Sequence, residues 1–311
     1  MIISASRRTD IPSYYSDWFF ARLKEGYVCT RNPMNYHQVS RISLAEDVVD
    51  GIVFWTKNPV PMLDKLTSLD GYPYYFQFTL NSYGKDMEAG IPGKKDVIVP
   101  AFQKLSRIIG PERVIWRYDP IILTPAYTVE YHIHSFERLA KQLSGYTNKC
   151  VISFFDMYRH LGPISRSMRF LPLDTEQIYE LAGRFADIAR KYNLTLETCA
   201  EAIDLSLFGI RHGPCIDGDL LERIIGHPLS LSKDKNQREE CGCMTSIDIG
   251  MYDSCVNGCM YCYANHSLGA VRKNIRSHDL GSPLLYGNIG PDDIIKDRVM
   301  ESCKIDQLGF F

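Results

Sequence analysis

The sequence predicts an α/β fold whose parallel strands curl into a full or partial (β/α) barrel of TIM type. Short β-branched and aromatic runs recur along the 311 residues, and each is followed by polar or proline-containing residues and then by a stretch of helical period. Strands of this kind that alternate with helices indicate βαβ units, and therefore a parallel sheet. The chain is also long enough for such a sheet to curl into a barrel.

Seven runs are predicted as strands, and they cover residues 2–6, 52–56, 74–80, 114–117, 151–155, 194–198 and 246–250. The clearest helix between them has one apolar face, formed by Ile178, Leu181, Phe185, Ile188 and Ala189. Asp174, with Gln177 three residues later, predicts where this helix begins, because such a pair can satisfy free backbone donors of the first turn. His132 and His134 lie in another helical stretch and point to different faces, so they are not expected to share a metal.

The chain is predicted to form one barrel domain over residues 1–311. Residues 27–44 are predicted to form a hairpin insert around Arg31, Asn32 and Pro33. Residues 85–96, rich in Gly and Lys, are predicted to form a mobile surface loop, and a cysteine-rich segment occupies residues 199–265 near the carboxyl end. We find no internal repeat, low-complexity tract or domain linker.

Composition limits the possible classes of function. The chain has 35 Lys and Arg against 37 Asp and Glu, with no long run of either sign. Binding to phosphate backbones needs clustered positive charge, so a broad nucleic-acid surface is not expected. The first residues lack the pattern of a secretory signal, and no apolar run approaches membrane-spanning length, so we expect a cytoplasmic protein without a membrane partner.

Ten cysteines are the most specific feature of the sequence. In a reducing compartment thiols stay free, so this number favours metal or redox chemistry over disulfides. Cys255, Cys259 and Cys262 form a C-x3-C-x2-C pattern after the last predicted strand, with an aromatic residue, Tyr261, directly before the third cysteine. Thiolates hold iron–sulfur clusters, and a cubane with three protein ligands leaves one iron open. The pattern therefore predicts a [4Fe–4S] cluster.

This pattern resembles the cysteine motif of the radical S-adenosylmethionine superfamily. The resemblance implies that S-adenosylmethionine chelates the open iron, and that one electron splits it to give a 5′-deoxyadenosyl radical that takes hydrogen from a substrate. It also implies an electron donor, such as a flavodoxin or ferredoxin, and a small-molecule, peptide or nucleotide substrate.

The position of the motif departs from that superfamily, where it follows the first barrel strand near the amino terminus. Here it occupies residues 255–262 of 311. A circular permutation accounts for the departure, because neighbours in a barrel are fixed by strand pairing and not by chain order. Residues 246–250 would then form the first strand of the superfamily, and residues 2–6 the second.

Nearly the whole chain also resembles an uncharacterised bacterial family known as domain of unknown function 1848, which implies no activity. The stretches that carry this resemblance are residues 6–12, 54–59, 117–120, 237–238, 241–243 and 255–265.

Candidate binding residues follow the predicted strands, because βα loops gather at the carboxyl ends of parallel strands. Arg7, Arg8, Thr9 and Asp10 are expected to meet the amino and carboxylate ends of S-adenosylmethionine, since their strand is the neighbour of the cysteine strand in the permuted order. Arg117 and Asp119 could bind ribose or orient a substrate, although such a pair is as often structural. Other loops that follow strands, among them residues 57–59 and 156–159, are expected to line the same site.

Four further cysteines could close a second site. Cys199, Cys215, Cys241 and Cys243 could hold an auxiliary [4Fe–4S] cluster or a tetrahedral structural zinc, or could be inert buried thiols. A hypothesis from a different class is a structural or interaction module without radical chemistry, in which zinc is held by some combination of Cys241, Cys243, Cys255, Cys259 and Cys262. Five cysteines exceed the four that one zinc needs, which favours two sites.

Overall fold

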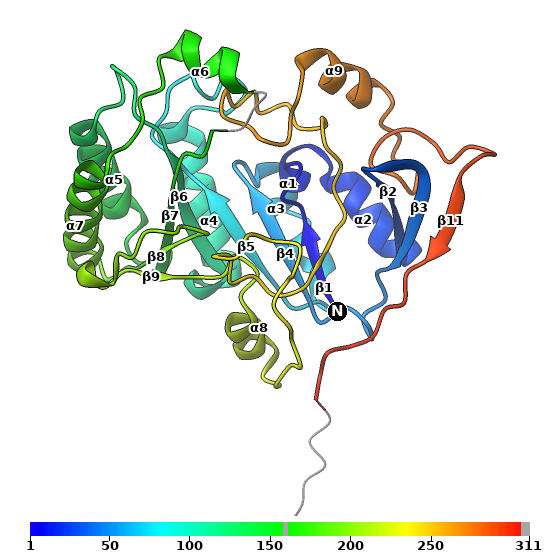
Figure 1. The fold of residues 1–311 in the computed structure, drawn as a ribbon. Helices are drawn as coiled ribbons and strands as arrows, with labels where there is room; N and C mark the ends of the chain where they lie inside the picture. Colours follow the sequence, from blue (N-terminus) through cyan, green and yellow to red (C-terminus); the bar gives the residue numbers. More distant parts are fainter. Residues whose placement is uncertain (158–160, 306–311) are drawn as a thin grey trace, which may run out of the picture.

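Eight strands form a parallel sheet at the centre of the computed structural model, which describes residues 1–157 and 161–305 (Figure 1). Their order across the sheet is β10-β1-β4-β5-β6-β7-β8-β9. The strands are β1 (Ile2–Ala5), β4 (Gly51–Thr56), β5 (Tyr74–Thr79), β6 (Val114–Ile121), β7 (Lys149–Phe154), β8 (Thr195–Thr198), β9 (Arg211–His212) and β10 (Ile247–Asp248). Within the described residues the edge strands β9 and β10 do not pair with each other, so the sheet is compatible with a partial barrel but is not a closed one.

Each of the seven predicted strands is present, with ends that differ by a few residues. The two-residue strand β9 was not predicted, because a segment this short has no measurable period. β10 pairs with β1 in parallel, with Ile247 opposite Ile3 and Asp248 opposite Ser4. The carboxyl-terminal strand therefore lies beside the amino-terminal one, which is the neighbour relation that the permuted order requires. Part of the loop at 156–159, namely Tyr158 and Arg159, lies outside the described residues.

The helices alternate with the strands along the chain. They are α1 (Ile11–Tyr14), α2 (Ser16–Glu25), α3 (Val60–Leu63), α4 (Val99–Ile109), α5 (Val129–Leu143), α6 (Gly162–Met168), α7 (Thr175–Lys191), α8 (Gly218–Ile225) and α9 (Leu268–Arg276). The predicted start of α7 is confirmed: the Asp174 side chain accepts from Gln177 N, and the Gln177 side chain accepts from Asp174 N. None of the helices in residues 1–157 and 161–305 has the length and apolar character needed to cross a bilayer.

The two faces of the sheet bury different partners, because alternate residues of a strand point to opposite faces. On one face the strands pack against α2, α4, α5 and α7 in the main core, where the rings of Phe136 and Phe185 stack with centroids 4.0 Å apart. On the other face a smaller cluster contains Ile2, Val53 and Tyr75, and these pack against α8 and against buried cysteines of the carboxyl-terminal region. That second face is the one on which the candidate site is built.

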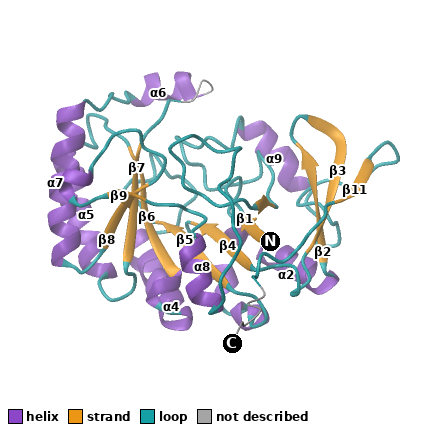
Figure 2. Ribbon diagram, turned by 60° about the horizontal axis from the view of Figure 1, so that its bottom comes forward, coloured by secondary structure: helices purple, strands orange, loops and turns teal. Residues whose placement is uncertain are grey.

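A small sheet stands beside the main one (Figure 2). Residues 27–44, predicted as a hairpin, contain the antiparallel strands β2 (Tyr27–Asn32) and β3 (Asn35–Ser43). A strand that was not predicted, β11 (Ile294–Asp297), adds to β3 in parallel. All four residues of β11 are exposed, so its sequence carries no burial pattern that could have revealed the pairing.

The two histidines of α5 have opposite environments, as their spacing predicts. His132 is fully buried, and its ring nitrogens lie 2.8 Å from the Tyr118 hydroxyl and 3.0 Å from the Ile122 carbonyl oxygen. His134 is exposed. Burial lowers the pKa of His132 from 6.5 to about 4, so the ring stays neutral at pH 7.

We predict that His132 makes the fold sensitive to mild acid. The unfolded chain binds the proton more readily, so the stability that neutral His132 contributes is complete above its ordinary pKa of 6.5 and is lost as the pH falls toward about 4, by about 3 kcal/mol in total. Denaturant unfolding at pH 7, 6 and 5 measures this loss. His132→Gln should flatten the pH dependence and the control His134→Gln should not; equal slopes in all three proteins would refute the prediction.

Candidate functional site

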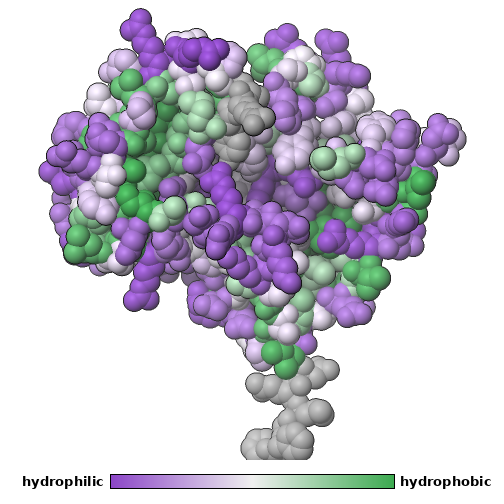
Figure 3. Space-filling view, in the orientation of Figure 1, coloured by the Kyte–Doolittle hydropathy of each residue, from purple (hydrophilic) through white to green (hydrophobic). Residues whose placement is uncertain are grey.

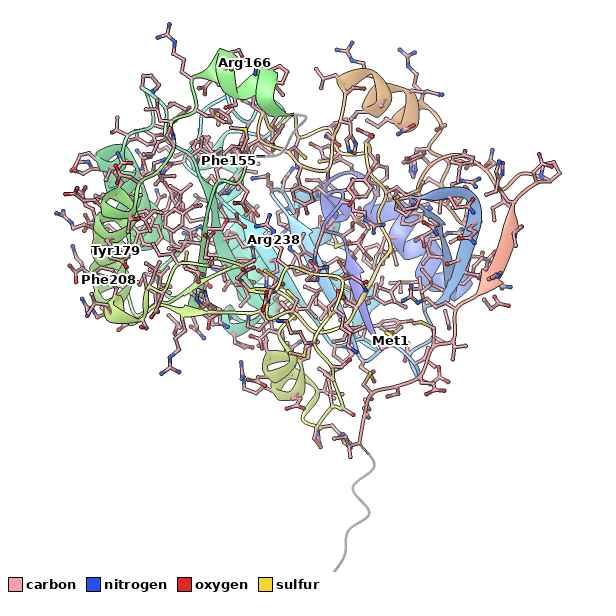
Figure 4. The ribbon with its side chains drawn as sticks, in the orientation of Figure 1. Met1, Phe155, Arg166, Tyr179, Phe208 and Arg238 are labelled. Atoms are coloured by element: carbon pink, nitrogen blue, oxygen red, sulfur yellow. The ribbon has the colours of Figure 1, made fainter. Side chains whose placement is uncertain are left out.

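One cavity of about 800 Å³ lies where the carboxyl ends of the strands meet the carboxyl-terminal segment. Every residue predicted to bind a metal or cofactor lines it: Arg7, Arg8, Thr9, Asp10, Arg117, Asp119, Cys199, Cys215, Cys241, Cys243, Cys255, Cys259, Tyr261 and Cys262. Hydrophilic side chains crowd the centre of the face seen in Figure 3. Arg238, near the centre of Figure 4, forms an ion pair with Asp156, so the carboxyl-terminal segment is tied to the loop after β7 beside this cavity.

Cys255, Cys259 and Cys262 lie together on the segment that follows β10, which we call the cysteine loop (residues 253–265). Burial raises the pKa of Cys255, and the neighbouring Cys259 and Cys262 raise it further. Burial also raises the pKa of Cys259 to about 12, although nearby Lys57 lowers it. Without a cation these thiols are protonated at neutral pH, so a bound metal would displace their protons.

Asp10 holds the cysteine loop in place. Its carboxylate accepts hydrogen bonds from Thr56 Oγ1 at 2.7 Å, Lys57 N at 2.7 Å, Ser13 N at 3.0 Å and Asn257 Nδ2 at 3.0 Å. Asn257 lies between the first two cysteines of the motif. Both carboxylate oxygens are therefore occupied by protein donors, which gives Asp10 a positioning role, and its contact with S-adenosylmethionine stays a prediction.

More than half of residues 85–96 are exposed, as predicted for a surface loop, but part of the segment packs against the cysteine loop. Met87, Glu88 and Ile91 are buried. The backbone N–H of Met260 donates to the Met87 carbonyl at 2.9 Å, and Glu88 forms an antiparallel bridge with Cys259. The polar composition of the segment suggested that all of it is exposed. Glu88 is buried nevertheless, because its charge is paired with lysine side chains.

A buried network fixes Tyr261, the aromatic residue of the motif. Its hydroxyl donates to Glu88 and accepts from Lys57 Nζ at 2.9 Å and from Asn81 Nδ2 at 3.1 Å. Lys57 and Lys94 both pair with Glu88. Burial alone would raise the pKa of Glu88, but the two lysines lower it to about 2, so this carboxylate is ionised at neutral pH. The network holds the ring of Tyr261 and, through it, the turn between the second and third cysteines.

Arg7 and Thr9 retain unused polar atoms beside the cavity. Arg7 Nη2 and Thr9 Oγ1 are buried and have no hydrogen-bond partner. The guanidinium of Arg7 lies 5.4 Å from the centroid of the Trp55 ring. Arg8 stacks over Tyr252 and makes one long contact, 3.4 Å from Nη1 to the Gly250 carbonyl. Buried donors without partners cost free energy unless a ligand satisfies them, so this corner of the cavity suits an anionic or polar group.

Arg117 and Asp119 are used within the protein. Arg117 Nε donates to Asp119 Oδ2 at 2.9 Å, and Arg117 Nη1 lies 2.8 Å from Cys215 Sγ. Asp119 also accepts from Ser153 Oγ. Of the two expectations for this pair, binding of ribose or a structural role, these contacts favour the structural one.

The other four cysteines, Cys199, Cys215, Cys241 and Cys243, gather beside Arg117, and we call them the four-thiol group. Cys199 Sγ and Cys215 Sγ are 3.0 Å apart. Cys243 Sγ lies 3.2 Å from the backbone N of Cys215, and the Cys215 and Cys241 thiols are its neighbours. The cysteines therefore form two sets, the cysteine loop and the four-thiol group. As the side chains stand in residues 1–157 and 161–305, no group of three or more His, Cys, Asp or Glu residues could hold a metal ion.

Two important acidic residues were missed by sequence reasoning. Glu88 carries no motif, and its burial depends on Lys57 from the loop after β4 and on Lys94 of its own segment. Asp248 joins β10 to β1: it accepts from Ser4 Oγ at 2.8 Å, Ser6 Oγ at 2.7 Å and Arg7 N at 2.8 Å. A carboxylate inside a predicted apolar strand was the one signal that could have identified Asp248.

A family model described as "Domain of unknown function (DUF1848)" matches residues 2–264. The chain belongs to the DUF1848 family. The matched region of this DUF1848 protein includes both sets of cysteines. No curated protein matches it. Among solved structures, a "putative alpha-L-fucosidase" from Bacteroides thetaiotaomicron VPI-5482 shares 12% identity over 69% of this chain and 82% of that one, with a TM-score of 0.26, which is too low to support a functional comparison.

We predict that Glu88→Gln destabilises the fold by about 3–5 kcal/mol at pH 7, because it leaves the ammonium groups of Lys57 and Lys94 without a buried counter-charge. Denaturant unfolding measures the change. Asp96→Asn, on an exposed residue of the same segment, is the matched control and should change stability by less than about 0.5 kcal/mol. Equal effects of the two substitutions would show that the ion-paired network does not stabilise the loop.

Proposed function

We propose that this DUF1848 protein is a radical S-adenosylmethionine enzyme whose [4Fe–4S] cluster is held by Cys255, Cys259 and Cys262. The observation that carries the proposal is that these three thiols lie on one short loop and line the same large cavity. The donor set fits the group, because three thiolates bind three irons of a cubane and leave the fourth open. When bound there, such a cluster would supply the single electron that splits S-adenosylmethionine into methionine and a 5′-deoxyadenosyl radical.

The strand order supports a permuted partial barrel of the kind found in that superfamily. β10 would take the place of the first barrel strand and β1 that of the second, and these two strands pair in parallel. The cysteine loop follows β10 directly, as the superfamily motif follows its first strand. The chain then continues the order through β4, β5, β6, β7 and β8.

The residues around the cavity suit the binding of S-adenosylmethionine. Arg7 Nη2 and Thr9 Oγ1 offer unsatisfied polar atoms at the end of β1, the strand next to the cysteine strand, and these could meet the carboxylate of the methionine part. Asp10 and Asn257 would keep the cysteine loop at a fixed place beside them. A volume of about 800 Å³ is within the range of small-molecule sites and leaves room for a substrate. A flavodoxin or ferredoxin would deliver the electron.

We predict that Cys259→Ala abolishes cleavage of S-adenosylmethionine while the fold is retained. Anaerobically purified and reconstituted wild-type protein should contain about four irons at this site and release methionine and 5′-deoxyadenosine under reduction. The variant should lose both properties and keep its circular dichroism spectrum. Cys29→Ala, at a buried cysteine of the small sheet, is the control and should retain both properties. Cleavage that persists in Cys259→Ala, or a colourless wild-type protein without iron, would rule out the proposal.

We predict that Arg7→Gln weakens binding of S-adenosylmethionine to the reconstituted protein by about 10- to 100-fold, since a hydrogen bond to a charged group contributes about 1.5–3 kcal/mol. Equilibrium dialysis with labelled S-adenosylmethionine measures the affinity. Arg272→Gln removes an exposed arginine of α9 and should leave the affinity unchanged. Iron analysis of both variants shows whether the cluster is intact. An Arg7→Gln variant with full iron and unchanged affinity would exclude Arg7 from the binding site.

A further inference from the structure

The four-thiol group is assembled from three separate parts of the chain. Cys199 follows β8, Cys215 precedes α8, and Cys241 and Cys243 lie in the loop before β10. In Figure 1 these segments, coloured from yellow-green to yellow, run together across the front of the sheet. Free thiols that are distant in sequence gain little by meeting at one point, because a thiol is a weak donor and a weak acceptor. Their convergence therefore calls for a common ligand.

We propose that the four-thiol group binds one zinc ion in a closed tetrahedral site, and not a second iron–sulfur cluster. The distance between sulfur atoms favours zinc over a cluster. A zinc ion with four bonds to sulfur of about 2.3 Å holds its sulfurs about 3.8 Å apart. Cys199 Sγ and Cys215 Sγ are 3.0 Å apart, and Cys243 Sγ lies 3.2 Å from the backbone N of Cys215.

The contacts between these thiols explain why the side chains as they stand do not enclose an ion. The sulfurs of Cys199 and Cys215 lie against each other and need to separate by only about 0.8 Å, from 3.0 Å to the tetrahedral spacing, to admit a single ion. A cubane places its own irons and sulfides between the thiolates and would force all four much further apart.

The surroundings of the four sulfurs stabilise negative charge. Cys243 Sγ accepts backbone N–H groups of Cys215 at 3.2 Å and Ile216 at 3.4 Å. Arg117 Nη1 lies 2.8 Å from Cys215 Sγ. The Arg7 guanidinium interacts electrostatically with Cys243 and Cys215. Four thiolates around Zn²⁺ carry a net charge of −2, and the nearby guanidinium groups of Arg117 and Arg7 would lower the free-energy cost of burying it. Zinc binding would release the four thiol protons to solvent.

The burial of the group indicates a structural role. Cys215, Cys241 and Cys243 are buried, and four thiolates fill a tetrahedral zinc ion without an open position for a substrate. The ion would join the loop before β10 to the residues that follow β8 and precede α8. β10 has only two residues and pairs on one side, so this attachment would fix the strand that carries the cysteine loop. The inference does not depend on the radical chemistry proposed above.

The test is metal analysis and zinc-edge X-ray absorption of the full-length protein. We expect about one zinc per chain, surrounded by four sulfurs at about 2.3 Å. Cys243→Ser should reduce zinc at least tenfold and leave the iron of the cysteine loop in place. Cys259→Ala should do the reverse, losing iron and keeping zinc. If Cys243→Ser does not fold, the absorption spectrum of the wild-type protein decides the question alone.

Three results would overturn the inference. The first is a wild-type protein without zinc that takes up about eight irons on anaerobic reconstitution, of which Cys243→Ser loses half. The second is a zinc spectrum with nitrogen or oxygen ligands in place of sulfur. The third is zinc that stays bound in a folded Cys243→Ser variant. Failure of the radical proposal would look different, since zinc would remain while iron and cleavage of S-adenosylmethionine are absent from the wild-type protein.

Discussion

The pairing of β10 with β1 is the constraint on which the candidate site depends. Only two residues on each strand are in register, so backbone hydrogen bonds alone hold the edge weakly. The carboxylate of Asp248 strengthens it by accepting from Ser4, Ser6 and the backbone of Arg7. Because Asp248 binds the start of the loop that follows β1, it sets the position of Arg7 relative to the cysteine loop. Residues from the two ends of the chain thus form one corner of the cavity.

Charged groups around the cavity divide into those that build it and those that remain available. Protein partners occupy the hydrogen-bonding groups of Asp10, Arg117 and Asp119, so these three residues fix loops and thiols in place. Arg7 and Thr9 keep polar atoms that no protein group satisfies. A fold tolerates such unsatisfied atoms where a ligand supplies the missing partner. Available donors, and not the total number of charges, therefore mark where a bound molecule should lie.

The sequence predicted features that depend on local pattern and missed those that depend on distant pairing. The seven strands were found because apolar runs end in polar loops, and the candidate residues were found because such loops meet at one edge of a parallel sheet. Glu88 was missed because its burial depends on Lys57 and on Tyr261, which is 173 residues away. β11 was missed because exposed residues carry no period. The hydrogen bonds of Asp10 to Thr56, Lys57 and Asn257 could not be predicted, because hydrogen-bond partners cannot be read from position in the sequence.

The two sets of cysteines differ in how the chain brings them together, and this difference matches their proposed chemistry. The cysteine loop carries its three thiols within eight residues, so one local segment presents all three. The four-thiol group needs β8, α8 and the loop before β10 to be in place, so it exists only when the sheet is assembled. A metal ion that is held in a closed site by ligands from distant segments stabilises the fold that brings those segments together. The proposed open cluster on a short loop would instead need that fold as a support, and the proposed attachment of β10 through zinc would provide it.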